Sequence, residues 1–179
     1  MQLFMRRPNL DDLPAVPDLP TGYTLRERRE GDDEALAALL ALTFEDANWS
    51  AERVRQEFVD SSHVQKMFVI DYNGVPVATA SAALRPEAYP GSGYVHYVGA
   101  HPEHGGKRLG YVVSLAVLHE FVHLGCRDAV LETDDFRLPA VRTYLNLGFV
   151  PESRHESHPE RWAAVETNLA TRTTPAQNS

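Results

Sequence analysis

The segment His101-Pro-Glu-His-Gly-Gly-Lys-Arg-Leu-Gly110 separates a predicted strand from a predicted long apolar helix, and it limits the folds open to this chain. Its glycines and its proline interrupt regular structure, and glycine allows backbone to approach a ligand closely. A helix that begins here directs unpaired N–H groups and the positive end of its dipole into the same space. With the charges of Lys107 and Arg108, the segment predicts an anion-binding site. It lacks the motif of a nucleotide P-loop and the spaced glycines of a dinucleotide site, and a plain strand-to-helix turn is the alternative.

The periodicity of apolar residues predicts the elements on either side of that segment. Before it, Asn73-Gly74 is a strong hairpin signal, and the predicted elements are a strand at 23–28, helices at 35–43 and 51–59, and strands at 67–70, 75–84 and 94–101. After it, they are a helix at 109–124, a strand at 129–133, a helix at 138–147 and a strand from Phe149. An antiparallel first half followed by alternating strands and helices predicts an α/β fold, with a central mixed β-sheet flanked by helices on both faces.

Length and proline content predict the domain organisation. A chain of 179 residues, 43% of them hydrophobic, corresponds to about one domain with a sizeable core. Residues 1–21 contain four prolines and little apolar periodicity, so we expect them to lie as an extended arm that pairs with no sheet. The domain itself is expected over residues 22–170, and residues 171–179 are expected to form a disordered tail.

Charge, hydropathy and cysteine content restrict the partners and the location of the protein. The 17 Lys and Arg residues against 25 Asp and Glu residues give a net charge of −8, which argues against binding to nucleic acid by phosphate neutralisation. No apolar run approaches the roughly 20 residues that span a bilayer, and the N-terminus lacks the apolar centre of a secretory signal. The single cysteine, Cys126, excludes an internal disulfide framework and fits a reducing compartment. We therefore expect a cytoplasmic protein with no nucleic-acid or membrane partner.

Two motifs stand in a fixed order along these elements. The first lies over Val98 to Gly110: the end of a predicted strand is followed by the pattern x-Pro-x-x-x-Gly-Lys-x-Leu-Gly, which leads into the long apolar helix. The second is Ala140-x-x-x-Tyr144-x-x-x-Gly148-Phe149. Together they resemble the GNAT superfamily of acetyl-CoA-dependent N-acetyltransferases, and the order of elements agrees from about Tyr23 to Phe149. The resemblance implies the GNAT acyl-CoA N-acyltransferase fold, acetyl-CoA as co-substrate and no metal. It also implies transfer of an acetyl or similar short acyl group to a primary amine through a direct ternary complex.

The resemblance further implies where CoA binds. In the family, the pyrophosphate lies on backbone N–H groups of the glycine-containing loop, and the pantetheine arm runs beside the preceding strand. The corresponding residues here are Val98, Gly99, Ala100, Gly105, Gly106, Lys107, Arg108, Leu109, Gly110 and Tyr111. Three positions depart from the family pattern: Gly105 where Arg or Gln is usual, Arg108 where Gly is usual, and Arg137 where Asn is frequent. We therefore expect a CoA site with non-standard contacts.

Acetyl transfer requires a neutral amine, a donor to the oxyanion and a proton for the departing thiolate. The resemblance implies that Tyr144 supplies the proton, and a core aromatic residue at helical spacing is the alternative. Strand alternation places four side chains on one face: Tyr94, His96, Val98 and Ala100. The resemblance makes His96, beside Tyr94, the candidate base, and the alternatives are a hydrogen-bonded core histidine or no dedicated base at all. The backbone N–H of Val98 or of a neighbour is the expected oxyanion donor.

A rival motif lies on the long helix, where His119-Glu120-Phe-Val-His123 spells the His-Glu-x-x-His pattern of zinc metalloproteases. The two histidines share a helix face, but the extended Gly-x-x-His continuation is absent, and Glu132 follows on a predicted strand too soon to be the third ligand. A third alternative is a GNAT-fold protein that binds acyl-CoA without catalysis, which the altered loop favours. The acceptor is expected to be a small-molecule or peptide amine, and a homodimer is one option for the assembly.

Overall fold

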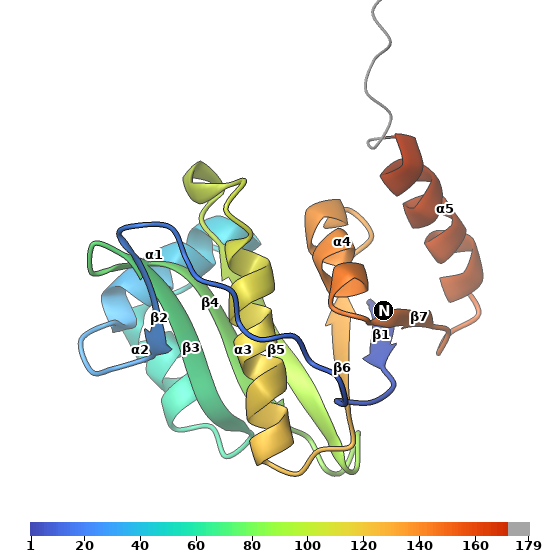
Figure 1. The fold of residues 1–179 in the computed structure, drawn as a ribbon, viewed down its shortest axis with the longest axis horizontal. Coiled ribbons are helices and arrows are strands. Elements are labelled where there is room, and N and C mark those ends of the chain that lie inside the picture. The colour runs from blue at the N-terminus through green and yellow to red at the C-terminus, as the bar shows by residue number, and fades with distance from the viewer. Residues whose placement is uncertain (172–179) are drawn as a thin grey trace, which may run out of the picture.

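The structure, a computed structural model, describes residues 1–171 (Figure 1). In this part of the chain, seven strands form one sheet in the order β2-β3-β4-β5-β6-β1-β7. The strands are β1 (Leu3–Arg7), β2 (Tyr23–Glu27), β3 (Val64–Tyr72), β4 (Val75–Leu84), β5 (Ser92–Ala100), β6 (Asp128–Thr133) and β7 (Val150–Glu152). The helices are α1 (Asp33–Phe44), α2 (Ala51–Val54), α3 (Leu109–His123), α4 (Leu138–Asn146) and α5 (His158–Thr171), with a π-helical turn at Arg55–Val59 and a 3₁₀ turn at Pro102–His104.

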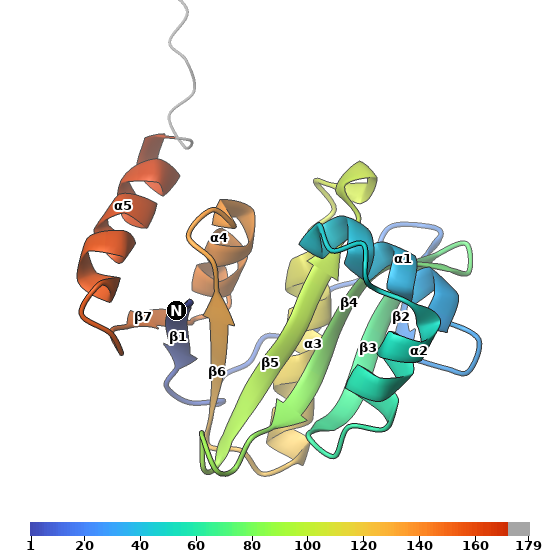
Figure 2. The ribbon, with the colours of Figure 1, turned by 180° about the vertical axis from the view of Figure 1, so that it is seen from behind.

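The sheet is mixed, and helices cover both of its faces. Strands β2 to β5 are antiparallel neighbours, β5 and β6 are parallel, and β1 pairs antiparallel with both β6 and β7. Helix α3 covers the face seen in Figure 1, and α1 and α2 cover the face seen in Figure 2. This arrangement confirms the predicted fold class.

The hairpin between β3 and β4 follows from its turn residues. Asn73 and Gly74 both have positive φ, 49° and 89°, which is the backbone that a two-residue hairpin turn of this hand requires. Because Asn and Gly adopt this conformation at low cost, the turn fixes the register in which Tyr72 pairs with Val75.

Helix α3 is apolar around most of its circumference because it is covered on two sides. Nine of its residues are buried: Leu109, Val112, Val113, Ser114, Leu115, Ala116, Val117, Leu118 and Phe121. One side packs on the sheet, and the connection between β1 and β2 crosses the other side (Figure 1). Leu10 of that connection is buried in the same core, and the carbonyl oxygen of Pro14 lies 2.8 Å from Nε2 of His119. The long apolar helix thus forms the centre of the domain.

The prediction that residues 1–21 pair with no strand is wrong for Leu3–Arg7. These residues form β1, which lies between β6 and β7, and Arg6 forms ion pairs with Asp128 at 2.6 Å and Glu152 at 2.7 Å. The physical reason is that every proline of this segment lies at residue 8 or later, so the N–H groups of Leu3–Arg7 are available for a ladder. The sheet therefore includes residues assigned to the arm, and only the stretch after Arg7 runs without regular structure.

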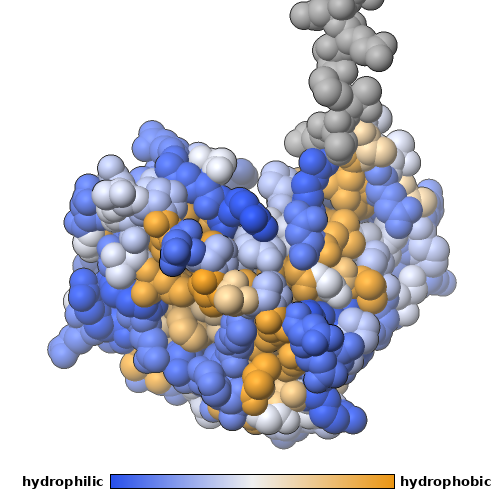
Figure 3. Space-filling model, in the orientation of Figure 1, coloured by the Kyte–Doolittle hydropathy of each residue, from blue (hydrophilic) through white to orange (hydrophobic). Residues whose placement is uncertain are grey.

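The outer surface agrees with the acidic, polar composition. Figure 3 shows hydrophilic residues over much of this face, with hydrophobic residues visible between them, among others over α4 and α5. Within residues 1–171, no helix is long and apolar enough to cross a membrane. Of the tail predicted over 171–179, Thr171 ends α5, and residues 172–179 lie outside the described part of the chain.

Candidate active site

Strands β5 and β6 are joined only near their beginnings. Their parallel ladder pairs Ser92, Gly93 and Tyr94 with residues 128–130 and goes no further, although β5 continues to Ala100. Figure 2 shows the two strands diverging beyond this ladder. The backbone of β5 from Val95 onward therefore presents N–H and C=O groups to an opening in the sheet. Two cavities lie along this stretch.

The first, the loop cavity, has a volume of about 480 Å³ and lies between the end of β5, the glycine-containing loop and α4. Eight of the ten residues predicted to bind CoA line it: Val98, Gly99, Ala100, Gly105, Gly106, Arg108, Leu109 and Gly110. The other two lie beside it. Lys107 Nζ is 3.5 Å from the carbonyl oxygen of Gly105, and the ring of Tyr111 lies 4.2 Å from the Arg108 guanidinium carbon.

The backbone of the loop explains one departure from the family pattern. Arg108, directly before α3, has φ 58° and ψ 29°, which is the left-handed region that favours glycine. A side chain costs roughly 1–2 kcal/mol in this conformation. Glycine at this position is therefore favoured by backbone geometry, whereas Arg108 adopts the left-handed conformation and adds a cation to the lining of the loop cavity.

The loop cavity has the donors that an anion requires. A Cβ added at Gly106 or Gly110 would meet no protein atom within 4 Å, so these glycines leave a hollow beside the start of α3. The first turn of α3 directs N–H groups without helical partners toward this hollow, together with the positive end of the helix dipole. Backbone donors of this kind, with Lys107 and Arg108 nearby, suit the pyrophosphate of CoA.

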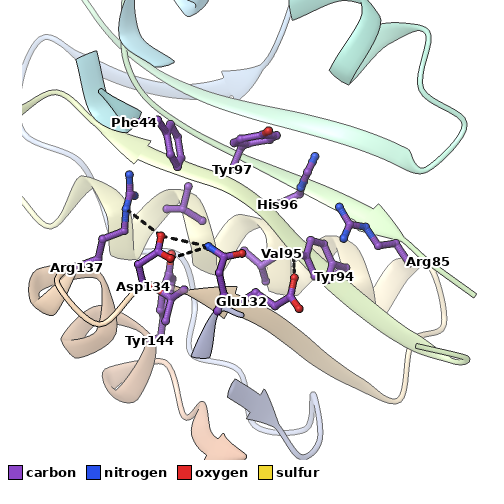
Figure 4. Close-up of a pocket in the computed structure, with 13 residues that line it drawn as sticks. Phe44, Arg85, Tyr94, Val95, His96, Tyr97, Glu132, Asp134, Arg137 and Tyr144 are labelled. Atoms are coloured by element: carbon purple, nitrogen blue, oxygen red, sulfur yellow. Dashed lines mark hydrogen bonds and ion pairs between the residues drawn. The ribbon is translucent and has the colours of Figure 1, made fainter. Parts of the chain in front are cut away.

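The second cavity, the polar cavity, has a volume of about 330 Å³ and lies between β5, the end of β6 and α1 (Figure 4). Its lining consists of Gln2, Phe44, Arg85, Tyr94, Val95, His96, Tyr97, Val98, Glu132, Thr133, Asp134, Arg137 and Tyr144. Val98, Arg137 and Tyr144 line both cavities. The two cavities therefore adjoin at these three residues.

Two carboxylates in the polar cavity are held by hydrogen bonds. Glu132 accepts from the hydroxyl of Tyr94 at 3.1 Å and from that of Tyr89 at 3.4 Å. Asp134 accepts from Gln2 Nε2 at 3.1 and 3.2 Å, and Arg137 Nε lies 4.0 Å from its Oδ2 (Figure 4). Both carboxylates thus occupy fixed positions from which they can attract a cationic group.

The predicted alternation of side chains along β5 is wrong after His96. In the pairing with β4, His96 lies opposite Ser81 and Gly99 opposite Thr79, so β5 has an extra residue, and Tyr97 has φ 47°. This β-bulge places His96 and Tyr97 on the same face, with ring centroids 4.4 Å apart, and Val98 instead packs with the core beneath α3. Tyr94 and His96 share a face as predicted, but Val98 does not share it.

Burial sets the protonation of the aromatic and imidazole groups. Burial, reinforced by the positive charge of Arg85 and by the electrostatic effect of His63, lowers the pKa of His96 to about 4. His96 is therefore neutral at pH 7. Burial, and then the negative charge of Glu132, raises the pKa of Tyr94, so its hydroxyl remains a donor.

Tyr144 of α4 is buried at the junction of the two cavities. Its ring packs edge-on to Phe149 at 6.0 Å, and burial raises the pKa of Tyr144 to about 12, while Arg137 acts in the opposite direction. A hydroxyl with this pKa is protonated at neutral pH. Tyr144 is thus a core residue that also lines both cavities, and its role as proton donor stays a prediction.

The model of the acetyltransferase (GNAT) family matches residues 33–149, from α1 to the residue before β7. The chain belongs to the GNAT family of acetyltransferases. It is 33% identical over 157 residues to a mycothiol acetyltransferase of Thermobispora bispora, and this alignment covers 81% of the chain and 52% of the relative. The GNAT chain described here thus spans about half the length of that curated relative.

Two solved structures show the same GNAT fold. A GCN5-related N-acetyltransferase from Sphaerobacter thermophilus superposes with a TM-score of 0.65 at 21% identity, over 84% of this chain and 48% of that chain. An aminoglycoside N-acetyltransferase in complex with CoA superposes with a TM-score of 0.65 at 17% identity, over 74% of this chain and 91% of that chain.

Among the lining residues of the polar cavity that the sequence-based site of this GNAT domain lacks are Gln2, Arg85, Glu132 and Asp134. Glu132 entered the sequence argument only as a metal ligand. A usable signal did exist, because Glu132 and Asp134 are alternate residues at the carboxyl end of β6, beside the parallel strand β5. Carboxyl ends of adjacent parallel strands meet at one edge of a sheet, where ligands commonly bind. Gln2 and Arg85 carry no such signal.

The His-Glu-x-x-His residues of α3 have structural partners in this GNAT domain. His119 meets the Pro14 carbonyl, and Glu120 forms an ion pair with Lys66 at 2.8 Å and lies 3.7 Å from His123. In residues 1–171, no group of three or more His, Cys, Asp or Glu side chains is arranged to hold a metal ion. These contacts attach the connection after β1 and strand β3 to α3.

Proposed function

We propose that this GNAT protein transfers an acetyl or similar short acyl group from acetyl-CoA to a primary amine within a ternary complex. The observation that carries the proposal is the junction of two cavities of different chemistry at Val98, Arg137 and Tyr144. One has the backbone donors that an anionic co-substrate requires, and the other has carboxylates that attract an amine. Two substrates bound in adjoining cavities can react directly without an acyl-enzyme intermediate.

Residues of the loop cavity would hold acetyl-CoA, which supplies the activated thioester. The first-turn N–H groups of α3 and the backbone of Gly105 and Gly106 bind the pyrophosphate, and Lys107 and Arg108 add positive charge. The free edge of β5 at Val98 to Ala100 hydrogen-bonds the pantetheine arm as an added strand would.

The residues at the junction act on the reacting groups. The bulge at Tyr97 removes one residue of β5 from regular pairing, which supports the N–H of Val98 as donor to the oxyanion. Tyr144, protonated at neutral pH, gives its proton to the departing thiolate.

The polar cavity prepares the amine. Glu132 attracts the ammonium form and accepts its proton, because this carboxylate lies in the polar cavity and the hydroxyls of Tyr94 and Tyr89 hold it in place. His96 is neutral and accepts a hydrogen bond from the amine, and its lowered pKa makes it a weak base. This assignment moves the role of base from His96 to Glu132.

A thiol-release assay with acetyl-CoA and a panel of primary amines, including an aminoglycoside, an amino acid and a peptide, tests the function. We expect acetyl-dependent thiol release with at least one amine, and stabilisation against heat by acetyl-CoA alone. Stabilisation without thiol release for every amine would instead favour an acyl-CoA-binding module. The absence of both thiol release and stabilisation would contradict the proposal.

The location and assembly are part of the proposal. A cytoplasmic location is supported by the unpaired Cys126 and by the use of acetyl-CoA. A homodimer is tested by light scattering at several protein concentrations.

A further inference from the structure

Arg85, which follows β4 directly, lines the polar cavity and has no acidic partner within residues 1–171. Among residues 1–171, its guanidinium forms no ion pair and donates no hydrogen bond. It forms a cation–π contact with Tyr94, with the guanidinium carbon 3.8 Å from the ring centroid. The other arginine of the cavity, Arg137, lies beside Asp134 and donates to the Thr43 carbonyl at 2.8 Å. Arg85 is therefore a cation in a binding cavity whose hydrogen-bond donors are unused.

The aromatic stack beneath Arg85 holds its guanidinium in place. The rings of Tyr94 and Tyr89 are stacked, with centroids 5.7 Å apart and planes 2° apart, and both hydroxyls donate to Glu132. A guanidinium stacked on an aromatic face keeps its N–H groups in the plane of the ion, where they remain available to a ligand. The stack thus prepares Arg85 to bind a planar anionic group with two parallel hydrogen bonds.

The charges of the polar cavity are ordered along its length. Figure 4 shows Arg85 at one end and Arg137 with Tyr144 at the other, and Glu132 lies between them. Arg137 and Tyr144 also line the loop cavity, whereas Arg85 lines only the polar cavity. The acyl group arrives from the loop cavity, so the reacting amine belongs at the Tyr144 end, and Arg85 faces the opposite end of the same acceptor.

We propose that the acceptor is an amine that also carries an anionic group, a carboxylate or a phosphate, and that Arg85 binds this group and determines acceptor specificity. The proposal rests on the proposed function, because it assigns the acceptor class of the same site. The neighbouring His96 is neutral and supplies no compensating negative charge, while Glu132 lies between Arg85 and the Tyr144 end and Asp134 lies beside Arg137 (Figure 4). An acceptor with both charges matches this order, and a plain amine leaves Arg85 without a partner.

Matched pairs of acceptors test the proposal. The probes are glycine, β-alanine and 4-aminobutyrate, each against its own carboxamide, and phosphoethanolamine against ethanolamine. Binding is measured by titration calorimetry on the full chain with CoA present, and kcat and KM by thiol release with acetyl-CoA. We expect at least one anionic member to bind about 10- to 100-fold more tightly than its neutral partner, as a charge-assisted pair of hydrogen bonds predicts. The carboxylate and phosphate series show which anion is preferred.

Variants then assign the preference to Arg85. Arg85→Gln should abolish the preference by raising KM for the anionic member relative to that of the neutral member. Arg85→Lys should restore part of it, because a lysine keeps the charge without the planar fork. Arg154→Gln is the control, because this substitution removes the same charge at a residue that does not line the polar cavity. The guanidinium carbon of Arg154 lies 5.3 Å from the centroid of the Tyr89 ring, and Arg154 forms an ion pair with Glu152 at 2.8 Å.

The outcomes separate this proposal from the proposed function. Thiol release with neutral amines, without any preference for anionic members, would overturn the acceptor class and leave acetyl transfer intact. An equal loss of preference in Arg85→Gln and Arg154→Gln would show a general effect of net charge and would also overturn it. If no amine is acetylated, the function fails, while preferential binding of an anionic amine that depends on Arg85 would still support the site.

Discussion

The loop cavity and the polar cavity adjoin, yet they are built in different ways. The loop cavity is made largely from one continuous stretch, Val98 to Gly110, and its chemistry comes from backbone N–H groups at the start of a helix. The polar cavity is lined by residues of α1, β5, β6 and α4, together with Gln2 before β1, Arg85 after β4, and Asp134 and Arg137 between β6 and α4. The difference separates a site that a short motif specifies from one that exists only when the sheet has assembled. It also explains why the co-substrate can be inferred from a motif and the acceptor cannot.

The largest effect is expected where the two cavities meet. Tyr144→Phe removes the hydroxyl and keeps the ring that packs on Phe149, so the fold and the loop cavity should be unchanged. We expect kcat to fall by about 10²- to 10⁴-fold, as for loss of a general acid, with the KM for acetyl-CoA unchanged. Thiol release measures both constants, and Tyr72→Phe, an exposed tyrosine outside both cavities, is the matched control. Unchanged kcat in Tyr144→Phe would restrict this tyrosine to its packing role.

A smaller effect, confined to the polar cavity, is expected from Glu132→Gln. The amide keeps an acceptor for Tyr94 but removes the negative charge that attracts an ammonium group. We expect the KM for the amine to rise about tenfold and kcat to fall at the same time, while acetyl-CoA still raises the melting temperature. A changed affinity for acetyl-CoA would show that the two cavities do not act as separate binding sites.

The next effect is on stability and concerns how strongly the polar cavity excludes water. The pKa of His96 is about 4 in the folded state against an ordinary value of 6.5, so the unfolded chain binds more protons between these two pH values. The contribution of neutral His96 is therefore fully present above pH 6.5 and is lost as the pH falls toward 4. His96→Gln should flatten the fall in melting temperature over this range, and the exposed His155→Gln should not. Parallel curves for His96→Gln and the unmodified protein would show that His96 is solvated.

The smallest effect is expected in the loop cavity, at Arg108. Arg108→Gly relieves the left-handed backbone, and we expect the free energy of unfolding to rise by about 0.5–1 kcal/mol, measured by chemical denaturation. Lys107→Gly is the matched control and should lower stability, because Lys107 has no positive φ to relieve. A less stable Arg108→Gly would show that the contact of Arg108 with Tyr111 outweighs the backbone strain.

The contrast between local sequence signals and long-range contacts also determines how much of the structure can be predicted from the sequence. Apolar periodicity, the Asn73-Gly74 turn and the two motifs predict the order of elements and the fold, because these are local signals. Strand β1 is missed because the prolines after Arg7 suggest an arm, and its pairing depends on partners more than a hundred residues away. The bulge at Tyr97 is missed because a tyrosine gives no sign of a positive φ.

The place of β1 between β6 and β7 also has a consequence for the order of folding. Gln2 and its partner Asp134 are 132 positions apart, whereas the loop cavity depends mainly on neighbours in sequence. During synthesis β1 leaves the ribosome long before β6, and contacts between distant segments form late because closing a long loop costs entropy. We expect the loop cavity to take shape first, with the polar cavity completed only when β1 joins β6 and β7.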